Sequence, residues 1–117
     1  MNNINDVYNL SKFNLPSNIT HLVLGDKFNK CIDNLPYNIT HLRLGYNFNQ
    51  CIKKLPNSII NLKLGNNFNQ CIEKLHNNIT NLTLGNNFNR CIDNLPSSLN
   101  NLILGTNYFN ILRTIAF

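Results

Sequence analysis

The four cysteines are the first residues whose type could support chemistry, and they recur at a spacing of twenty residues. They are Cys31, Cys51, Cys71 and Cys91. Four thiolates bind zinc only when every sulfur lies about 2.3 Å from the metal. Repeats stacked at about 4.8 Å would instead place the outer two thiols roughly 14–15 Å apart, and their parallel Cβ vectors suit a disulfide poorly. We therefore predict buried structural thiols, with a metal site or a disulfide as the minor alternatives.

Two histidines also share a column of this twenty-residue spacing. His21 and His41 would place two imidazoles about 5 Å apart on the outward side of a strand, where they could share a metal ion. The column offers no third ligand, because it continues as Asn61, Asn81 and Asn101. We therefore predict that both histidines are surface residues and that the chain has no metal site.

The sequence contains no recognisable arrangement of catalytic residues. All five glycines fall in one column of the repeat, which leaves none for a phosphate-binding loop. No cysteine lies outside its own column, no carboxylates are paired, and the three histidines and the few serines have no arranged partners. We therefore predict that the chain is not an enzyme and that it carries no cofactor.

These columns exist because one unit of twenty residues occurs five times. The units begin at Leu15, Leu35, Leu55, Leu75 and Leu95. Each follows the pattern Leu-Pro-x-x-Ile-x-x-Leu-x-Leu-Gly-x-Asn-Phe-Asn-x-Cys-Ile-x-x, with small departures. The alternating pair, such as Leu62 and Leu64, predicts a short strand with both leucines inward. Twenty residues leave no room for a strand and a full helix, so the rest of each coil should be extended, turn or 3₁₀ structure.

The predicted fold is a β-rich repeat solenoid with little α-helix. Coils that stack in register place their strands side by side, which gives a parallel sheet along one face and turns on the other. One coil buries too little apolar surface to fold alone, so stacking must supply the core. We expect Ile19, Phe28, Ile32 and Leu35, with their equivalents in later units, to fill the interior.

The glycine and asparagine columns predict how neighbouring coils contact each other. A column made only of glycine indicates either a positive φ or a close approach of the next coil. Its members are Gly25, Gly45, Gly65, Gly85 and Gly105. Side-chain amides both donate and accept hydrogen bonds, so stacked asparagines can form a structural ladder. The two asparagine columns are Asn29, Asn49, Asn69 and Asn89, and Asn47, Asn67, Asn87 and Asn107.

The two ends of the chain depart from the repeat. We divide the chain into an N-terminal cap (residues 1–14), five repeats (residues 15–110) and a C-terminal apolar tail or cap (residues 111–117). Ile4, Val7 and Tyr8 lie at helical spacing, which predicts a short helix or an irregular turn covering the first coil. The C-terminal tail either folds over the last coil or forms an end-to-end homodimer, and the chain could also be cut from a longer array.

Composition limits the partners and the compartment. The chain has 117 residues, of which 13% are charged, and its formal net charge is +5. This charge could favour an acidic partner or nucleic acid, but the acids are mixed among the bases, so nucleic-acid binding is disfavoured. No apolar run approaches the roughly 20 residues of a membrane-spanning helix, and the N-terminus does not resemble a signal peptide. We expect a cytoplasmic protein with free thiols.

The repeat resembles a known family. The run Ile39-x-x-Leu42-x-Leu44-x-x-Asn47 has the spacing of the leucine-rich-repeat core, and the Leu-Gly-x-x-Phe-Asn run that overlaps it is similar to the FNIP (IP22-like) repeats of protists and large DNA viruses. The resemblance covers about residues 15–110, although that family's repeat is usually 22 residues long. It implies a leucine-rich-repeat-like solenoid that recognises proteins, in the host cytoplasm if the source is viral.

The outward strand positions are where the repeats differ most, and we predict that a protein partner binds there. One variable column contains Val23, Arg43, Lys63, Thr83 and Ile103, and another, just after the glycines, contains Asp26, Tyr46, Asn66, Asn86 and Thr106. Variation on an otherwise constant scaffold is typical of a recognition surface. The predicted binding residues are His41, Arg43, Tyr46, Lys63, Asn66 and Thr83. The alternative functions are a structural, self-associating protein and a weakly nucleic-acid-binding basic solenoid.

Overall fold

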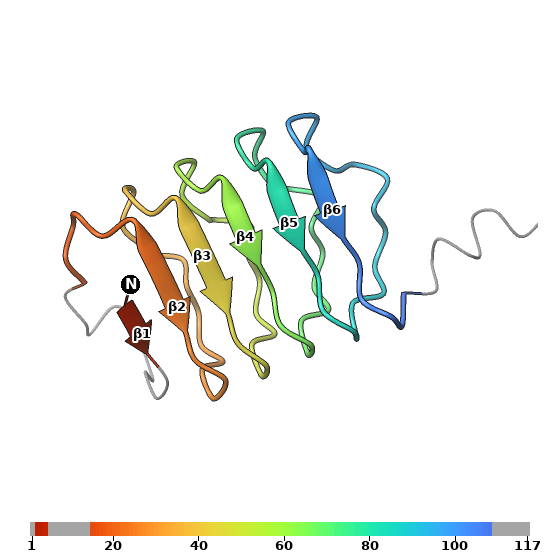
Figure 1. Ribbon diagram of the computed structural model, residues 1–117, viewed down its shortest axis with the longest axis horizontal. Coiled ribbons are helices and arrows are strands. Elements are labelled where there is room, and N and C mark those ends of the chain that lie inside the picture. The colour runs from red at the N-terminus through yellow and green to blue at the C-terminus, as the bar shows by residue number, and fades with distance from the viewer. Residues whose placement is uncertain (1, 5–14, 109–117) are drawn as a thin grey trace, which may run out of the picture.

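Six short parallel strands form one sheet along a face of the molecule (Figure 1). The computed structural model describes residues 2–4 and 15–108. The strands are β1 (Asn2–Ile4), β2 (His21–Leu24), β3 (His41–Leu44), β4 (Asn61–Lys63), β5 (Asn81–Thr83) and β6 (Asn101–Ile103). They lie in chain order, so each coil adds one strand beside the previous one. Turns and extended segments complete the coils, and the described residues contain no helix. The predicted β-rich solenoid is confirmed.

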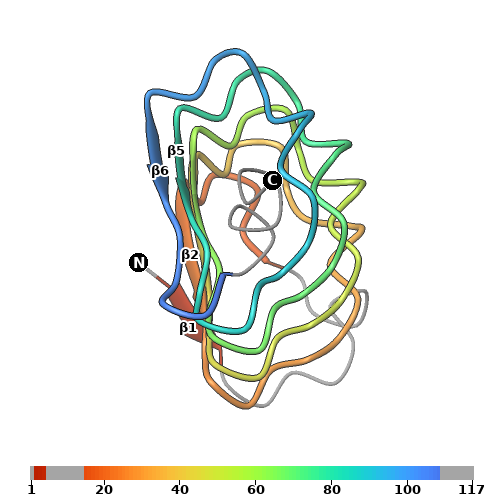
Figure 2. The same cartoon turned by 90° about the vertical axis from the view of Figure 1, so that its right-hand side faces the viewer.

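Neighbouring strands from β2 to β6 pair between residues that lie twenty positions apart. Leu22 pairs with Leu42, and Leu42 pairs with Leu62, in parallel register. The same offset relates the other strand pairs of the described chain, including β1 with β2. Viewed at right angles to Figure 1, the coils superpose as nested loops with the strands on one side (Figure 2). The predicted register is confirmed, so like side chains lie over like.

The inward side chains of successive coils form one continuous core. Leu62, Leu64, Phe68 and Ile72 of the middle coil are almost completely buried. The phenylalanine rings of neighbouring coils stack with centroids 6.2 Å apart, and Tyr108 extends the stack at 5.9 Å. The predicted interior is therefore confirmed for the central coils, where a coil packs on each side.

The core is less complete at the ends of the described stack. Ile19 of the first unit and Ile92 and Leu95 near the other end are only partly buried. Leu102, predicted to point into the core, is 36% exposed. Among the described residues a coil packs on only one side of β6, which explains why its leucine is less covered than those of the inner strands.

The glycine column marks a close approach between coils and not an unusual backbone conformation. None of the described residues, glycine or other, has a positive φ. A Cβ atom added to Gly65 would lie 2.6 Å from the carbonyl carbon of Gly45, and the same conflict recurs at Gly85 and Gly105. Of the two explanations that the sequence left open, the close approach is correct and the positive φ is wrong.

Stacked asparagines form hydrogen-bonded ladders between the coils. The backbone N–H of Asn49 donates to Asn29 Oδ1 at 2.8 Å, and that of Asn69 donates to Asn49 Oδ1 at 2.9 Å. In the other column, Asn67 Nδ2 donates to Asn47 Oδ1 at 3.3 Å. Each coil thus satisfies polar backbone groups of the next coil, which the core leucines and phenylalanines cannot do.

Replacing Asn49 with alanine should destabilise the protein by about 1–3 kcal/mol. The substitution removes the acceptor for the N–H of Asn69 and for Gln70 Nε2, which donates to the same oxygen at 3.0 Å. Urea denaturation measures the loss. Asn49→Asp keeps an oxygen at this position and should lose less, so equal losses for the two variants would contradict a structural role for the ladder.

The N-terminal prediction was wrong where the structure describes it. The helical spacing predicted a helix or irregular turn that includes Ile4, but Asn2–Ile4 is an extended strand whose Ile4 pairs with Leu24. Pairing with the open edge of β2 satisfies backbone groups that an exposed parallel strand would leave free. Val7, Tyr8 and the C-terminal tail lie outside the described residues.

Candidate functional site

The outward face of the sheet carries the variable side chains that the repeat pattern singled out. The residue between the two leucines of each strand points away from the core, and these residues pair with one another across the sheet. Arg43 and Lys63 are exposed at its centre, with Thr83 beside them and Ile103 exposed on β6.

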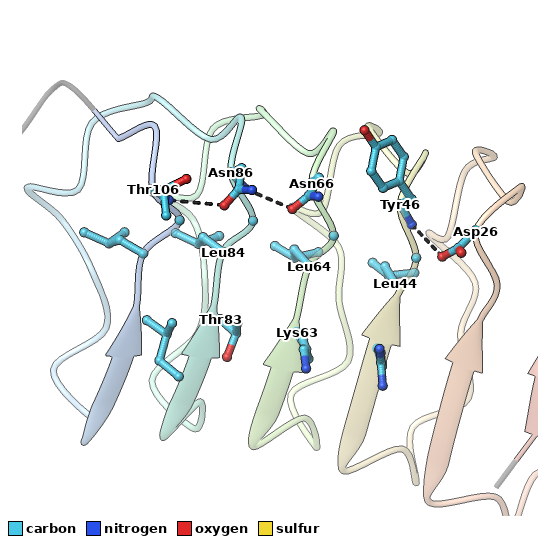
Figure 3. Close-up of a pocket in the computed structure, with 17 residues that line it drawn as sticks. Asp26, Leu44, Tyr46, Lys63, Leu64, Asn66, Thr83, Leu84, Asn86 and Thr106 are labelled. Atoms are coloured by element: carbon cyan, nitrogen blue, oxygen red, sulfur yellow. Dashed lines mark hydrogen bonds between the residues drawn. The ribbon is translucent and has the colours of Figure 1, made fainter.

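An open groove of about 430 Å³ runs across the ends of these strands, where the chain turns at the glycines. It brings together five of the six predicted binding residues: Arg43, Tyr46, Lys63, Asn66 and Thr83. Figure 3 shows Lys63 and Thr83 on the strands and Tyr46 and Asn66 in the turns above them. The groove was not itself predicted, because its shape depends on how the turns stack.

The sixth predicted residue, His41, lies away from this groove. It lines a smaller pocket of about 180 Å³ with His21, Val23 and Asn61. Arg43 and Lys63 line both pockets and connect them.

The centre of the groove is positively charged. Cα pairing places Arg43 directly beside Lys63 on the neighbouring strand, where like charges repel. Neither side chain forms an ion pair with any of the described residues. Asp26 lies at the edge of the groove, and its Oδ1 accepts a 3.0 Å hydrogen bond from the backbone N–H of Tyr46.

A third ladder follows the glycines, and it is interrupted at Tyr46. The backbone N–H of Asn86 donates to Asn66 Oδ1 at 3.1 Å, and that of Thr106 donates to Asn86 Oδ1 at 3.2 Å. Tyr46 has no side-chain oxygen near its backbone, so it cannot continue the series from Asp26 to Asn66. Figure 3 shows the two separate groups of hydrogen bonds. The Asp and Asn residues of this column are the sequence signal for the ladder, which the variation within the column obscures.

The two neighbouring histidines stack face to face on the strand side. The rings of His21 and His41 lie 4.1 Å apart between centroids and 10° from parallel. The hydroxyl oxygen of Thr40 lies 2.9 Å from His41 Nδ1, and Thr20 contacts His21 in the same way. Partial burial, and then the neighbouring His21, lower the pKa of His41.

The lowered pKa of His41 predicts that the protein loses stability in mild acid. In mild acid the unfolded chain binds protons more readily than the folded chain does. The contribution of neutral His41 to stability is therefore fully present above about pH 6.5, and it is lost as the pH falls through the pKa of the folded state. Burial also lowers the pKa of His76, which acts in the same direction. The difference between the melting temperatures at about pH 7.5 and 5.5 should be smaller in His21→Asn than in wild type. This variant removes the charge that His21 places beside His41, and it leaves the contribution of His76 unchanged. An unchanged difference would contradict a role for the pair.

The prediction of buried cysteines was wrong. All four thiols are free and exposed. The next residue in each of the first three units, such as Ile52 after Cys51, is buried. Because consecutive side chains of an extended segment point to opposite sides, an inward isoleucine directs the preceding cysteine outward. The backbone N–H of Asp93 donates to Cys91 Sγ at 3.4 Å, which lowers the pKa of this thiol. The Asp93 side chain, desolvation and the negative charges of Asp93 and Glu73 raise it by more, so the net shift of the Cys91 pKa is upward.

Metal ligands are not clustered in the part of the chain that the structure describes. No group of three or more His, Cys, Asp or Glu side chains there could hold a metal ion. Among the same residues, no helix has the length and apolar character to cross a membrane.

Comparison with known proteins gives the family. Four consecutive segments match the FNIP Repeat, at residues 8–34, 32–54, 53–76 and 74–107. The structure is also similar to the crystal structure of CroV588, described as a novel circular LRR protein, with a TM-score of 0.59 and 35% sequence identity. That similarity covers 80% of this chain and 18% of the CroV588 chain, so this chain spans less than a fifth of the solved relative. No curated protein matches the chain.

Repeat proteins of the leucine-rich-repeat type generally mediate protein interactions, and such folds are typically non-enzymatic. The four matching segments together span residues 8–107, and the solenoid agrees with the matched fold. The chain belongs to the FNIP repeat family.

Proposed function

We propose that this chain is a non-enzymatic module that binds a protein partner through the outward strand face. The observation that carries the proposal is the contrast between the two sides of each strand. The inward leucines are the same in every coil, whereas the outward column changes from Val23 to Arg43, Lys63, Thr83 and Ile103. Selection for folding alone gives no reason for a basic centre between apolar ends.

The groove has the physical character of a protein-binding surface. Tyr46 is 50% exposed and stands beside the charged centre, and tyrosine and arginine are over-represented among residues that dominate binding energy. The turns that carry these side chains are held by inter-coil hydrogen bonds, such as the one between Tyr46 N–H and Asp26. A surface that is already ordered loses less conformational entropy when a partner binds.

Reversing the charge of the groove tests this proposal. The variant Arg43→Glu/Lys63→Glu should capture at least about tenfold less of any specific partner from a cytoplasmic extract, as measured by quantitative mass spectrometry. Lys53→Glu/Lys74→Glu is the matched control, since it makes the same charge change at exposed residues outside the groove. A captured partner is first shown to bind the wild-type chain when both are purified. If the groove variant captures that partner as well as wild type does, this face is excluded as the binding site.

A cytoplasmic location accords with the same proposal. The four exposed cysteines are unpaired, and free thiols are the usual state in a reducing compartment. Separation of cellular fractions followed by detection of the chain tests the location, and recovery from a secreted fraction would contradict it.

Self-association is the second candidate function, and the C-terminal end of the described stack favours it. Leu102 and Ile103 of β6 are 36% and 59% exposed, and β6 pairs only with β5 among the described strands. A second copy could cover these residues. Light scattering at increasing concentration distinguishes the candidates, because a strict monomer at high concentration would exclude self-association.

A further inference from the structure

One backbone N–H in the groove lacks the hydrogen bond that its equivalents in other coils have. The N–H groups of Tyr46, Asn86 and Thr106 each donate to a side-chain oxygen of the preceding coil. The N–H of Asn66 has no acceptor among the described residues, because the side chain preceding it in the column is Tyr46. Asn66 is partly buried as a residue, and a ligand oxygen can supply the acceptor that its N–H lacks.

Two positively charged side chains line the same groove as this N–H. Lys63 lies three residues earlier in the same coil, and Arg43 pairs with Lys63 from the neighbouring strand. Asp26, the groove's acidic residue, lies two coils from Asn66, which corresponds to roughly 10 Å along the stack. Its Oδ1 is already the acceptor for Tyr46 N–H. The groove therefore offers one amide donor and two cations at its centre, with its own carboxylate at the edge.

We propose that this groove binds a carboxylate of an acidic peptide segment in the partner, with the backbone N–H of Asn66 as the specific donor. One carboxylate oxygen accepts from the Asn66 N–H and takes the position that Asp26 Oδ1 has for Tyr46. The exposed side chains of Lys63 and Arg43 line the same groove, and they turn toward the bound carboxylate to supply charge-assisted hydrogen bonds. The exposed ring of Tyr46 lies beside the acidic side chain and contacts its methylene groups. This inference rests on the proposed protein-binding role of the outward face.

An acidic peptide fits the groove better than a nucleic acid does. A nucleic acid needs a series of cations along its phosphate backbone, whereas Arg43 and Lys63 are the only positively charged residues that line this groove among the described residues. Other lysines, such as Lys53 and Lys74, lie outside it, and the acidic Glu73 is adjacent to Lys74 in sequence. A single carboxylate matches one amide donor with two flanking charges.

Two substitutions of Tyr46 distinguish the contribution of the Asn66 N–H to binding from that of the rest of the groove. Tyr46→Asn supplies a side-chain oxygen, as Asn66 and Asn86 do for the coils that follow them, and should occupy the Asn66 N–H internally. Tyr46→Ala removes the same ring without supplying an acceptor, so it is the matched control. Tyr46 is exposed and lines the groove, so neither substitution alters the core, and the melting temperature of each variant reports whether it folds.

The probes are a fluorescein-labelled peptide containing a run of glutamates, its glutamine counterpart, and a single-stranded oligonucleotide. The glutamate peptide should bind wild type at least about tenfold more tightly than the glutamine peptide does. It should move the Asn66 amide proton downfield in ¹⁵N–¹H spectra of wild type and of Tyr46→Ala. In Tyr46→Asn this resonance should already be shifted and should not respond, and the preference for glutamate should fall several-fold.

Three results would overturn the inference: an Asn66 amide that does not respond to the glutamate peptide, an equal response in Tyr46→Asn, or tighter binding of the oligonucleotide. The charge-reversal variant distinguishes loss of the carboxylate contact from loss of the proposed protein-binding function. If Arg43→Glu/Lys63→Glu still abolishes capture of the partner while the Asn66 amide is silent, the face binds a protein without the carboxylate contact. If neither variant set has an effect, the face itself is excluded.

Discussion

Substituting Gly65 with alanine should destabilise the solenoid by about 3 kcal/mol or more. The added Cβ would overlap the carbonyl oxygen of Gly45 and lie 2.6 Å from its carbonyl carbon. Both atoms belong to a backbone that is fixed by strand pairing on each side, so neither a rotamer change nor a local shift can relieve the contact. The two coils must separate, and separation exposes the core between them.

Equilibrium unfolding in urea measures this effect, with Asn77→Ala as the control. Asn77 is exposed and lies in a turn of a neighbouring coil, so its replacement should change the stability by no more than about 0.5 kcal/mol. Since small proteins are typically stable by only about 5–15 kcal/mol, the Gly65 variant should unfold at a clearly lower urea concentration. If the two variants unfolded at the same concentration, the close approach of the coils would be wrong.

Truncating the central ring of the phenylalanine stack should cost about 3–5 kcal/mol. Phe68 is fully buried, and its ring stacks at 6.2 Å on Phe48 on one side and on Phe88 on the other. Phe68→Ala leaves a cavity that the fixed coils cannot close, so both neighbouring rings lose contacts together with the burial of Phe68 itself.

The control for this variant is Tyr37→Ala, which also removes an aromatic ring. Tyr37 is 80% exposed, so its loss should change the stability little. Thermal and urea unfolding of both variants provide the comparison. A Phe68→Ala protein as stable as Tyr37→Ala would show that the ring stack does not hold the coils together.

The sequence alone was enough to predict the register because the repeat leaves little freedom. Every unit has the same length, so Leu22, Leu42 and Leu62 can all face the core only if the strands pair at an offset of twenty residues. The same argument predicted the buried phenylalanines, whose stacked rings lie at the equivalent place in each coil. Periodicity thus determines which residues share a column.

Periodicity does not determine which way a column points outside the strands. Cys51 and Ile52 are adjacent and equally regular in sequence, and only the path of the extended segment decides that the isoleucine is buried and the cysteine exposed. The prediction of buried cysteines follows from the usual preference of free cysteine for the protein interior. In this chain the neighbouring isoleucine takes the interior position instead.

The candidate site was predictable in its residues but not in its shape. Arg43, Tyr46 and Lys63 could be assigned to one face by strand alternation and column position. The groove between them, and the interrupted hydrogen bonding at Asn66, depend on how the turns beyond the glycines stack. No repeat pattern specifies the position of a turn to that accuracy.

In-register stacking of twenty-residue coils is the central claim, and nuclear Overhauser contacts between coils test it most directly. The account predicts contacts between the backbones of Leu42 and Leu62 and between the rings of Phe48 and Phe68, always at an offset of twenty residues. Contacts at a different offset, or none between neighbouring coils, would contradict the account.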